Sequence, residues 1–342
     1  MMRPDSSPSS SLDGGGAQVR HIGIALTSLS PLRKLQQLER ALDEAQRLGF
    51  QLVELDIAPF GLIMNGALHD RRLSDLVGVL RNFDLRYTVH GLMRLNLAYD
   101  SRHELCRRVM ARQIEICGAI GASVLVHHSG LQALDEVRYG VRRSLPTDEE
   151  LAAGARREVD AFRELAPMAA DRGLTIAIEN GDPHQWEYNV LARFSVSRSE
   201  LIRYHPRLHV DPIIRQLEAI DQPNVGMTLD VGHLYIAAND LRFDFLAAVR
   251  RAAPWVRHIH AHDNFGLLDR GFDAERDRWP FGEADVHLPP GWGNIPHRQV
   301  LDRLSEYKGD IVLEIKPDFL DEFEEALLNM ETILDDVRVK AR

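Results

Sequence analysis

Histidines and carboxylates stand at the ends of successive apolar, strand-like segments of this chain. The segments read RYTVH, SVLVHH, LTIAIEN, VGMTLD, VRHIHAH and DIVLEI, and their terminal ligand-type residues are His90, His127, Glu179, Asp230, His260 and Glu314. Imidazole nitrogens and carboxylate oxygens are the ligands that transition metals and Mg²⁺ use in proteins. If the strands are parallel neighbours, these side chains converge at one rim. The pattern therefore predicts a polynuclear metal site.

Four of these residues form the predicted core of the site. Glu179, Asp230, His260 and Glu314 combine three carboxylates with one imidazole. This mixture suits Zn²⁺, Mn²⁺, Mg²⁺, Co²⁺ or Fe²⁺ and does not select among them. Without a cation, three converging carboxylates would repel one another, and at least one would have to stay protonated. We therefore expect one to three divalent metal ions per chain.

Five further residues form a predicted outer set of ligands. His233 follows Asp230 by three residues in DVGH, and Asp285 and His287 share one face of an extended segment in ADVHLPPGWGN. His90 and His127 complete the outer set.

Two groups of neighbouring histidines limit how many can be ligands. In the doublet His127-His128, one ring is expected to bind while the other points into the barrel wall. His258, His260 and His262 share one face of an alternating segment, so at most one or two of them can bind a metal.

Apolar strand patterns alternate with helical patterns along the whole chain. Strands are predicted at 21–27, 51–57, 85–90, 123–128, 174–180, 225–230, 256–262 and 310–315. Helices are predicted at 31–50, 71–83, 103–122, 146–173, 213–220, 243–253, 297–307 and 319–337. Eight strand–helix units in strict alternation predict a closed (β/α)₈ TIM barrel of the α/β class. A doubly wound open sheet is the alternative, but no GxGxxG follows the first strand.

Composition sets the remaining bounds. Residues 1–19 are rich in Ser, Gly and Pro, which predicts a flexible tail before one domain at 20–342. Two cysteines and the lack of a long apolar run predict a cytoplasmic protein without a membrane segment. The net charge of −10 disfavours nucleic acid as a partner. The oligomeric state stays open.

The motifs resemble those of the xylose-isomerase-like TIM-barrel superfamily, which includes sugar isomerases, epimerases and endonuclease IV. The resemblance covers roughly residues 20–337 and rests on VHGLMRLNLA, VHHSG, AIENGD, LDVGH, IHAHD, DVHLPPGWGNI and VLEIKP. It implies that all nine ligands of a three-zinc site are present. Glu179 would bridge two metals, the first completed by His90 and His127 and the second by Asp230, His260 and Glu314. His233, Asp285 and His287 would hold the third.

Two functions follow from this resemblance. The first is a metal-dependent isomerase or epimerase of a small sugar, polyol or keto-sugar, phosphorylated or not, in which Glu179 and Glu314 transfer a proton through an enediolate. His233, Asn180, His262 and Trp292 would contact the substrate. The alternative is a zinc-dependent phosphoesterase similar to the abasic-site nuclease. The sequence departs from the nuclease pattern after His90, where Gly-Leu-Met-Arg carries no evident DNA wedge.

Overall fold

Eight parallel strands close into a barrel in the computed structural model, which describes residues 17–26, 34–128, 132–271 and 275–340. The strands are β1 (Ile22–Leu26), β2 (Leu52–Asp56), β5 (Arg86–His90), β6 (Val124–His127), β7 (Thr175–Glu179), β8 (Val225–Asp230), β9 (Val256–Ala261) and β10 (Ile311–Leu313). Each pairs with its predecessor and successor, and β1 closes the ring by pairing with both β2 and β10. The predicted TIM barrel is confirmed.

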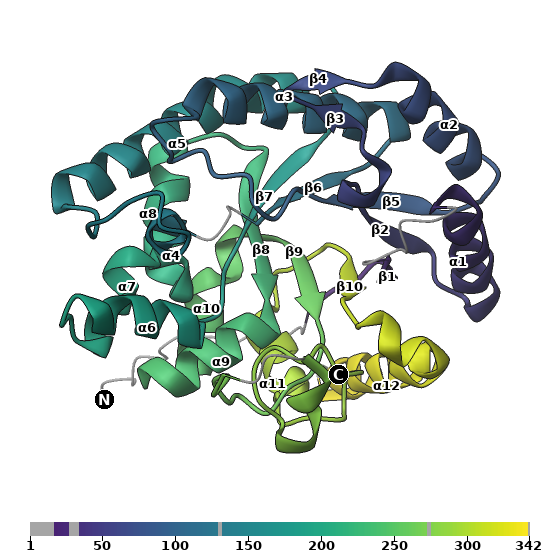
Figure 1. The fold of residues 1–342 in the computed structure, drawn as a ribbon. Coiled ribbons are helices and arrows are strands. Elements are labelled where there is room, and N and C mark those ends of the chain that lie inside the picture. The colour runs from purple at the N-terminus through teal and green to yellow at the C-terminus, as the bar shows by residue number, and fades with distance from the viewer. Residues whose placement is uncertain (1–16, 27–33, 129–131, 272–274, 341–342) are drawn as a thin grey trace, which may run out of the picture.

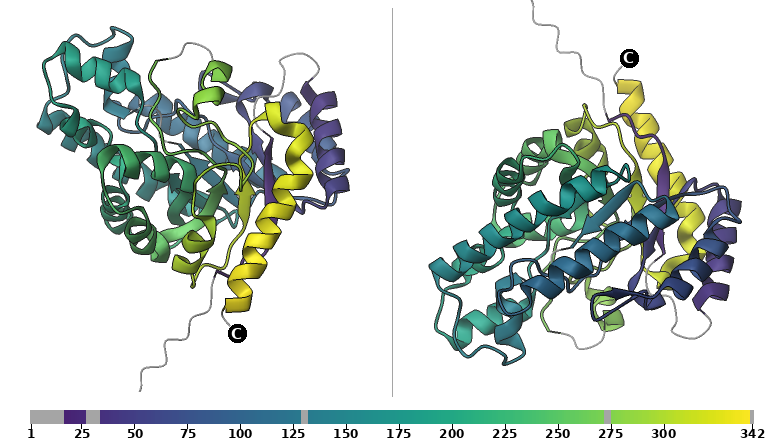
Figure 2. Two further views of the ribbon diagram at one scale, coloured as in Figure 1. Left: turned by 90° about the horizontal axis from the view of Figure 1, so that it is seen from below. Right: turned by 90° about the horizontal axis from the view of Figure 1, so that it is seen from above.

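Helices surround the barrel, as Figure 1 shows. The eight predicted helices are α1 (Lys34–Leu48), α2 (Asp70–Leu80), α3 (His103–Ile120), α5 (Asp148–Ala170), α8 (Val210–Ile220), α10 (Phe245–Ala252), α11 (His297–Arg303) and α12 (Phe323–Lys340). Their apolar faces pack on the strands and leave the polar faces outside. The first and last described segments lie side by side, with the purple β1 beside the yellow segment in both views of Figure 2.

Further short elements interrupt the predicted strict alternation. They are the hairpin strands β3 (Ile63–Met64) and β4 (Ala67–Leu68), and the helices α4 (Asp135–Arg138), α6 (Gln185–Arg193), α7 (Leu201–Tyr204) and α9 (Val231–Leu241). Short 3-10 turns cover Ala58–Phe60, Gln132–Leu134, Arg198–Glu200, Pro206–Leu208, Ala253–Trp255, Glu275–Asp277, Trp279–Phe281 and Pro317–Glu322. These additions lie mainly in the loops that follow the strands, where TIM barrels build their sites.

The inward-facing side chains change character along the barrel axis. Leu52 at the start of β2 forms a small apolar cluster with Ala25 and Val312. Two residues further along β2 and β10, the inward positions are Glu54 and Glu314, because side chains alternate across a strand. The apolar layer closes the bottom of the barrel, and the polar layer above it positions the site.

The N-terminal boundary differs slightly from the expected one. Most of the predicted tail, residues 1–16, lies outside the described residues. Ala17 is buried, and the N–H of Gln18 donates to the carbonyl of Tyr307 (2.8 Å). Residues 17–19 therefore pack against the barrel. Among the described residues, none of the helices is long and apolar enough to cross a bilayer.

Candidate metal centre

The four predicted core residues meet at the polar end of the barrel. Nδ1 of His260 lies 2.7 Å from Glu179 Oε1, 3.0 Å from Glu314 Oε2 and 3.8 Å from Asp230 Oδ2. One ligand atom from each of the four residues falls within 4.8 Å of the others. Neighbouring parallel strands bring them together, since β7, β8, β9 and β10 are consecutive in the barrel.

The charges of this core cluster fit a divalent cation. Burial alone raises the pKa of the Glu179 carboxyl, but the charge and hydrogen bond of His260 outweigh it and lower the pKa to about 2. The same imidazole holds the pKa of Glu314 well below its usual range. Within the described chain, Oε2 of Glu179 is buried without a hydrogen-bond partner. Ionised, under-coordinated carboxylate oxygens of this kind are suitable ligands for a metal.

Glu54 is a member of the site that the sequence patterns did not reveal. It is fully buried on β2, and its Oε1 lies 2.8 Å from Nε2 of His260. Its Oε2 is 2.9 Å from both Nε2 of His258 and Oγ1 of Thr88. The carboxylate thus faces the ring edge of His260 opposite the core cluster. A carboxylate in this place orients a metal-binding histidine and fixes which ring nitrogen is left to bind.

Asn180 supports Asp230 through its side-chain amide. Its Nδ2 donates to the carbonyl of Asp230 (2.9 Å), and its Oδ1 accepts from the N–H of Asp230 (3.0 Å). Asp230 in turn caps α9 by accepting from the N–H of His233 (2.7 Å). Asn180, predicted to touch the substrate, is buried and engaged in holding Asp230.

A second cluster lies beside the core cluster and consists of His233, His262, Asp285 and His287. Nε2 of His233 is 3.0 Å and Nε2 of His287 is 2.5 Å from Asp285 Oδ2. These three residues are the predicted third-metal ligands. His262, which the sequence placed in the substrate set, joins them from the position directly after β9. The described residues therefore offer a second group of ligand-type atoms within 4.8 Å of one another.

In the doublet His127-His128, the ring that lies at the site is not the predicted one. His127 points away from the core cluster, with its ring against Phe162 (5.1 Å between centroids) and its Nε2 3.5 Å from Glu158. His128 instead lies 5.9 Å from the ring of His90. Nε2 of His90 is 3.9 Å from a carboxylate oxygen of both Glu179 and Glu314. His128, and not His127, therefore accompanies His90 at the site.

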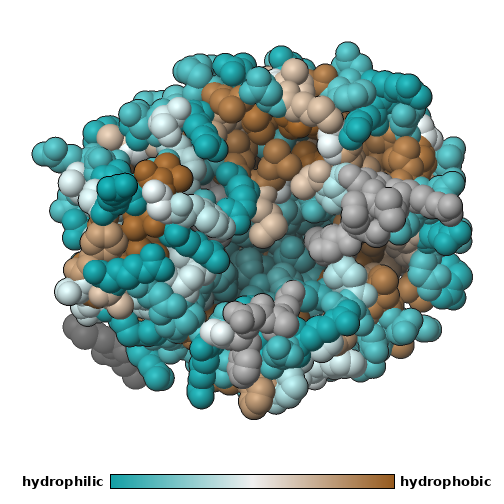
Figure 3. Space-filling view, viewed as in Figure 1, coloured by the Kyte–Doolittle hydropathy of each residue, from teal (hydrophilic) through white to brown (hydrophobic). Residues whose placement is uncertain are grey.

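A cavity of about 900 Å³ opens above the two clusters. Figure 3 shows a hollow with hydrophilic residues in the centre of this face. The ligand-type residues of its wall are Asp56, His90, His128, Asp182, His184, His233, Asp269, Asp285, His287, Glu314 and Asp318, and the cationic ones are Arg276, Arg278 and Lys316. Trp292, predicted to wall the pocket, instead donates to Glu325 (2.7 Å) and packs on Phe319.

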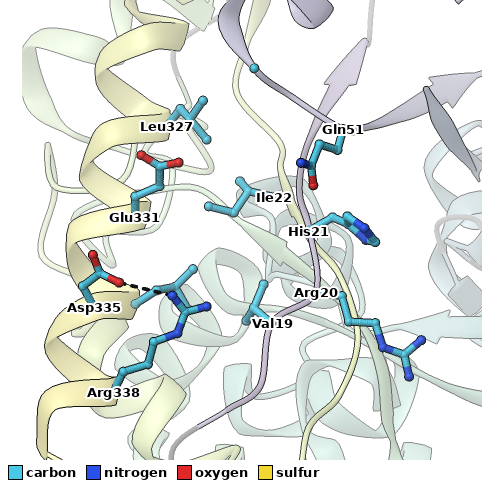
Figure 4. A pocket seen from close by; sticks show the side chains of 11 residues that line it. Val19, Arg20, His21, Ile22, Gln51, Leu327, Glu331, Asp335 and Arg338 are labelled. Carbon is cyan, nitrogen blue, oxygen red and sulfur yellow. Dashed lines mark hydrogen bonds and ion pairs between the residues drawn. The ribbon is translucent and has the colours of Figure 1, made fainter. Parts of the chain in front are cut away.

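A second hollow, of about 430 Å³, lies at the opposite end of the barrel between the start of β1 and α12 (Figure 4). Glu331 and the paired Asp335 and Arg338 form its α12 side, and Ile22 on the other side points toward them, whereas Arg20 and His21 point away. Its lining includes none of the predicted ligands. Of these two cavities, only the one at the C-terminal end of the strands is lined by predicted ligands.

Comparisons with known proteins agree with this architecture. The family model of the xylose isomerase-like TIM barrel matches residues 42–333. Among solved structures, a D-tagatose 3-epimerase-like protein is 20% identical, covers 94% of this chain and 100% of its own, and has a TM-score of 0.64. A D-allulose 3-epimerase from Methylomonas sp. is 16% identical over 94% of this chain and 99% of its own, with a TM-score of 0.60. The IOLI protein, solved with a bound zinc atom, is 18% identical over 94% of this chain and 99% of its own, with a TM-score of 0.59. At these low identities, the structural similarity establishes a shared fold.

One curated relative matches part of the chain. An uncharacterized protein of Methanocaldococcus jannaschii is 27% identical over 155 residues, which is 45% of this chain. The match spans 40% of that relative's own length.

Proposed function

Because the chain belongs to the xylose isomerase-like TIM-barrel family, we propose that it is a divalent-metal-dependent isomerase or epimerase of a small sugar, polyol or keto-sugar. The observation that carries this proposal is the core cluster of Glu179, Asp230, His260 and Glu314, which reaches the cavity of about 900 Å³ through Glu314. Solved sugar 3-epimerases with the same fold support the substrate class.

The core cluster would hold the cation, and two of its carboxylates would move the proton. A divalent cation there would supply Lewis-acid polarisation of a substrate carbonyl and a neighbouring hydroxyl. One carboxylate of the pair Glu179 and Glu314 accepts the proton from the carbon between those oxygens, which leaves an enediolate. In an isomerisation, the carboxylic acid so formed returns the proton to the neighbouring carbon; in an epimerisation, the other glutamate takes a proton from solvent and delivers it to the opposite face of the same carbon. Their lowered pKa values keep both groups ionised in the resting site, as a general base requires.

The cavity suits a polar small molecule. Its volume of about 900 Å³ lies within the range of small-molecule sites. Lys316 and the pairs Arg276–Asp318 and Arg278–Asp269 lie in its wall. The hydroxyl groups of a substrate would find hydrogen-bond donors and acceptors there. The side chains of Arg276, Arg278 and Lys316 would bind a phosphate group of a phosphorylated substrate.

A zinc-dependent phosphoesterase similar to endonuclease IV is the second candidate. The second cluster, together with His90 and His128, favours it, because clustered metals stabilise both the attacking and the leaving oxygen of a phosphodiester. The net charge of −10 opposes binding to a duplex.

Proton exchange separates the two candidates. The metal-loaded protein is incubated in D₂O with ketoses, polyols and their phosphates, and the loss of C–H signals is followed by NMR. We expect exchange with at least one compound, loss of this exchange in Glu314→Gln, and a much smaller effect of Asp285→Asn. Cleavage of an abasic duplex without any C–H exchange would instead establish the phosphoesterase.

A further inference from the structure

We infer that Asp182 is a specificity-determining residue, whose carboxylate accepts hydrogen bonds from substrate hydroxyl groups beyond the reacting carbons. This role rests on the proposed function, because it concerns the sugar or polyol of that reaction. Asp182 lies in the loop after β7, three residues beyond Glu179, and lines the cavity of about 900 Å³. It is not among the described residues of the core cluster or the second cluster. A substrate whose reacting carbons lie at the core cluster would therefore meet Asp182 with its remaining hydroxyl groups.

The carboxylate of Asp182 is buried and has open acceptor positions. The residue is 7% exposed, and its Oδ2 lies 3.4 Å from Nδ1 of His184. In the part of the chain that the structure describes, the side chain makes this one ion pair and accepts no further hydrogen bond. An ionised carboxylate has about four lone-pair sites, and buried polar groups are normally hydrogen-bonded. The open sites of Asp182 are therefore available to hydroxyl groups in the cavity.

The ion-pair partner of Asp182 is itself held by its neighbours. The ring of His184 stacks on Trp186, with centroids 6.1 Å apart and planes inclined by 29°. Cζ of Arg138 lies over the same indole, 4.5 Å from the ring centroid. This stacked row restrains His184 and, with it, the orientation of the Asp182 carboxylate.

Buried contacts behind the loop fix the position of Asp182. The N–H of His184 donates to Oε2 of Glu187 (2.9 Å), and Oε1 of Glu187 lies 2.9 Å from Nδ1 of His205. Both Glu187 and His205 are buried. A Cβ at position 181 would lie 2.8 Å from Nε2 of His205, so Gly181 lets the loop pass close to that ring. The loop is thus ordered before a substrate arrives, which lowers the entropy cost of binding.

Lys316 supplies a hydrogen-bond donor near this acceptor. It lies two residues beyond Glu314 and lines the same cavity, and its Nζ donates to the carbonyl of Asp285 (3.1 Å). Burial lowers the pKa of Lys316 to about 8, and the charge of Asp182 opposes this shift. A hydroxyl group donates to a carboxylate and accepts from an ammonium group. The substrate end at Asp182 is therefore hydroxylated and uncharged, because an anionic group there would meet a like charge.

Affinity measurements on variants test this role without requiring turnover. The metal-loaded protein is titrated with D-fructose, D-ribulose and xylitol, and binding is followed by saturation-transfer NMR. We expect Asp182→Ala to weaken the binding of at least one probe by about 10- to 100-fold, the range of a charge-assisted hydrogen bond. Asp182→Asn, which keeps one acceptor oxygen, should recover part of this loss. Asp240→Ala removes a carboxylate of similar side-chain exposure (15% against 10%) outside the cavity wall and should bind like the wild type.

Deoxygenated probes separate a direct contact from a general loss of structure. In the probe that binds best, each hydroxyl group beyond the carbonyl and its neighbour is replaced by hydrogen in turn. One of these compounds should bind the wild type about 10-fold more weakly than its parent, and should bind Asp182→Ala as well as its parent does, because contacting groups are not additive.

Three results would overturn the role of Asp182. They are equal affinities of the wild type and Asp182→Ala for every probe, additive losses with every deoxygenated probe, and a wild type that binds none of the three compounds. Binding that depends on Asp182 without any C–H exchange in D₂O would contradict only the proposed function.

Discussion

His260 is held between two sets of carboxylates that act at opposite edges of its ring. Glu179 and Glu314 approach Nδ1, while Glu54 approaches Nε2 at 2.8 Å. Glu54 is fully buried and is not among the residues that line the cavity. We therefore expect it to act on the core cluster through the imidazole of His260, as a positioning residue.

Replacing Glu54 with glutamine should weaken cation binding at the core cluster by roughly 10- to 100-fold, the usual range for an outer-shell partner. The amide keeps the shape of the side chain but loses its charge toward His260. Chelator competition on the apoprotein measures the effect. Thr88→Val is the matched control, because it removes one hydrogen bond from Glu54 and leaves the carboxylate in place. Equal affinities of Glu54→Gln and wild type would contradict the positioning role.

The two histidines of the doublet should respond differently to substitution. Burial lowers the pKa of His128 to about 4, so the ring is neutral at pH 7, the form that binds metals. We expect His128→Gln to reduce turnover by more than about 10-fold, in the range of lost metal-site groups. His127→Gln should chiefly lower the melting temperature, because its ring packs on Phe162. Turnover is measured at saturating metal, and the reverse order of effects would restore His127 as the ligand.

At the scale of elements, a buried ionic cluster joins α5, α8 and the end of β7. Nη2 of Arg207 donates to Glu158 (2.7 Å), and its Nη1 donates to the carbonyl of Glu179 (3.4 Å). Gln216 on α8 also donates to Glu158 (2.7 Å). This cluster supports the backbone of Glu179 from behind the barrel.

Acid should weaken this support within a defined pH range. Burial raises the pKa of Glu158, but Arg207 outweighs it and lowers the pKa to about 2 from an ordinary 4.5. A lowered folded-state pKa stabilises the protein fully above pH 4.5, and the stabilisation fades as pH falls toward 2. Glu158→Gln should reduce the free energy of unfolding by roughly 3 kcal/mol at pH 7. Urea denaturation should show a smaller difference from wild type at pH 3. A difference that does not change with pH would exclude this account.

For the whole molecule, cation binding should appear as thermal stability. Ligand-type residues on, or directly after, seven of the eight barrel strands and in the loop after β9 surround the two clusters. A cation that binds only the folded state at 100 times its dissociation constant adds about 2.7 kcal/mol. For a domain of this size we expect chelation to lower the melting temperature by roughly 5 °C or more. Differential scanning calorimetry with and without chelator measures it, and identical melting curves would argue against cation binding.

The barrel and the strand-end positions of Glu179, Asp230, His260 and Glu314 follow from the sequence alone. Near-continuous apolar strands alternating with amphipathic helices specify parallel β/α units. Eight such units close, and closure brings strand ends to one rim. Helix α9 escaped prediction because VGHLYIAANDL is buried along most of its length and shows little amphipathic periodicity. Its start depends on the cap supplied by Asp230, which is also a candidate ligand.

Local sequence thus determined which chemical groups reach the rim, because side-chain alternation and strand order are local properties. Only the tertiary structure decided which of those groups lie together in the core cluster and which lie in the second cluster. Glu54 and His258 are 204 positions apart and touch across the barrel. Neither the choice of His128 over His127 nor the approach of His262 to Asp285 has a signature in its own segment. The curvature of the barrel sets the direction of each ring, and the path of the loops sets which residue it meets. The ligand-type residues at the strand ends therefore form two clusters only when the chain folds.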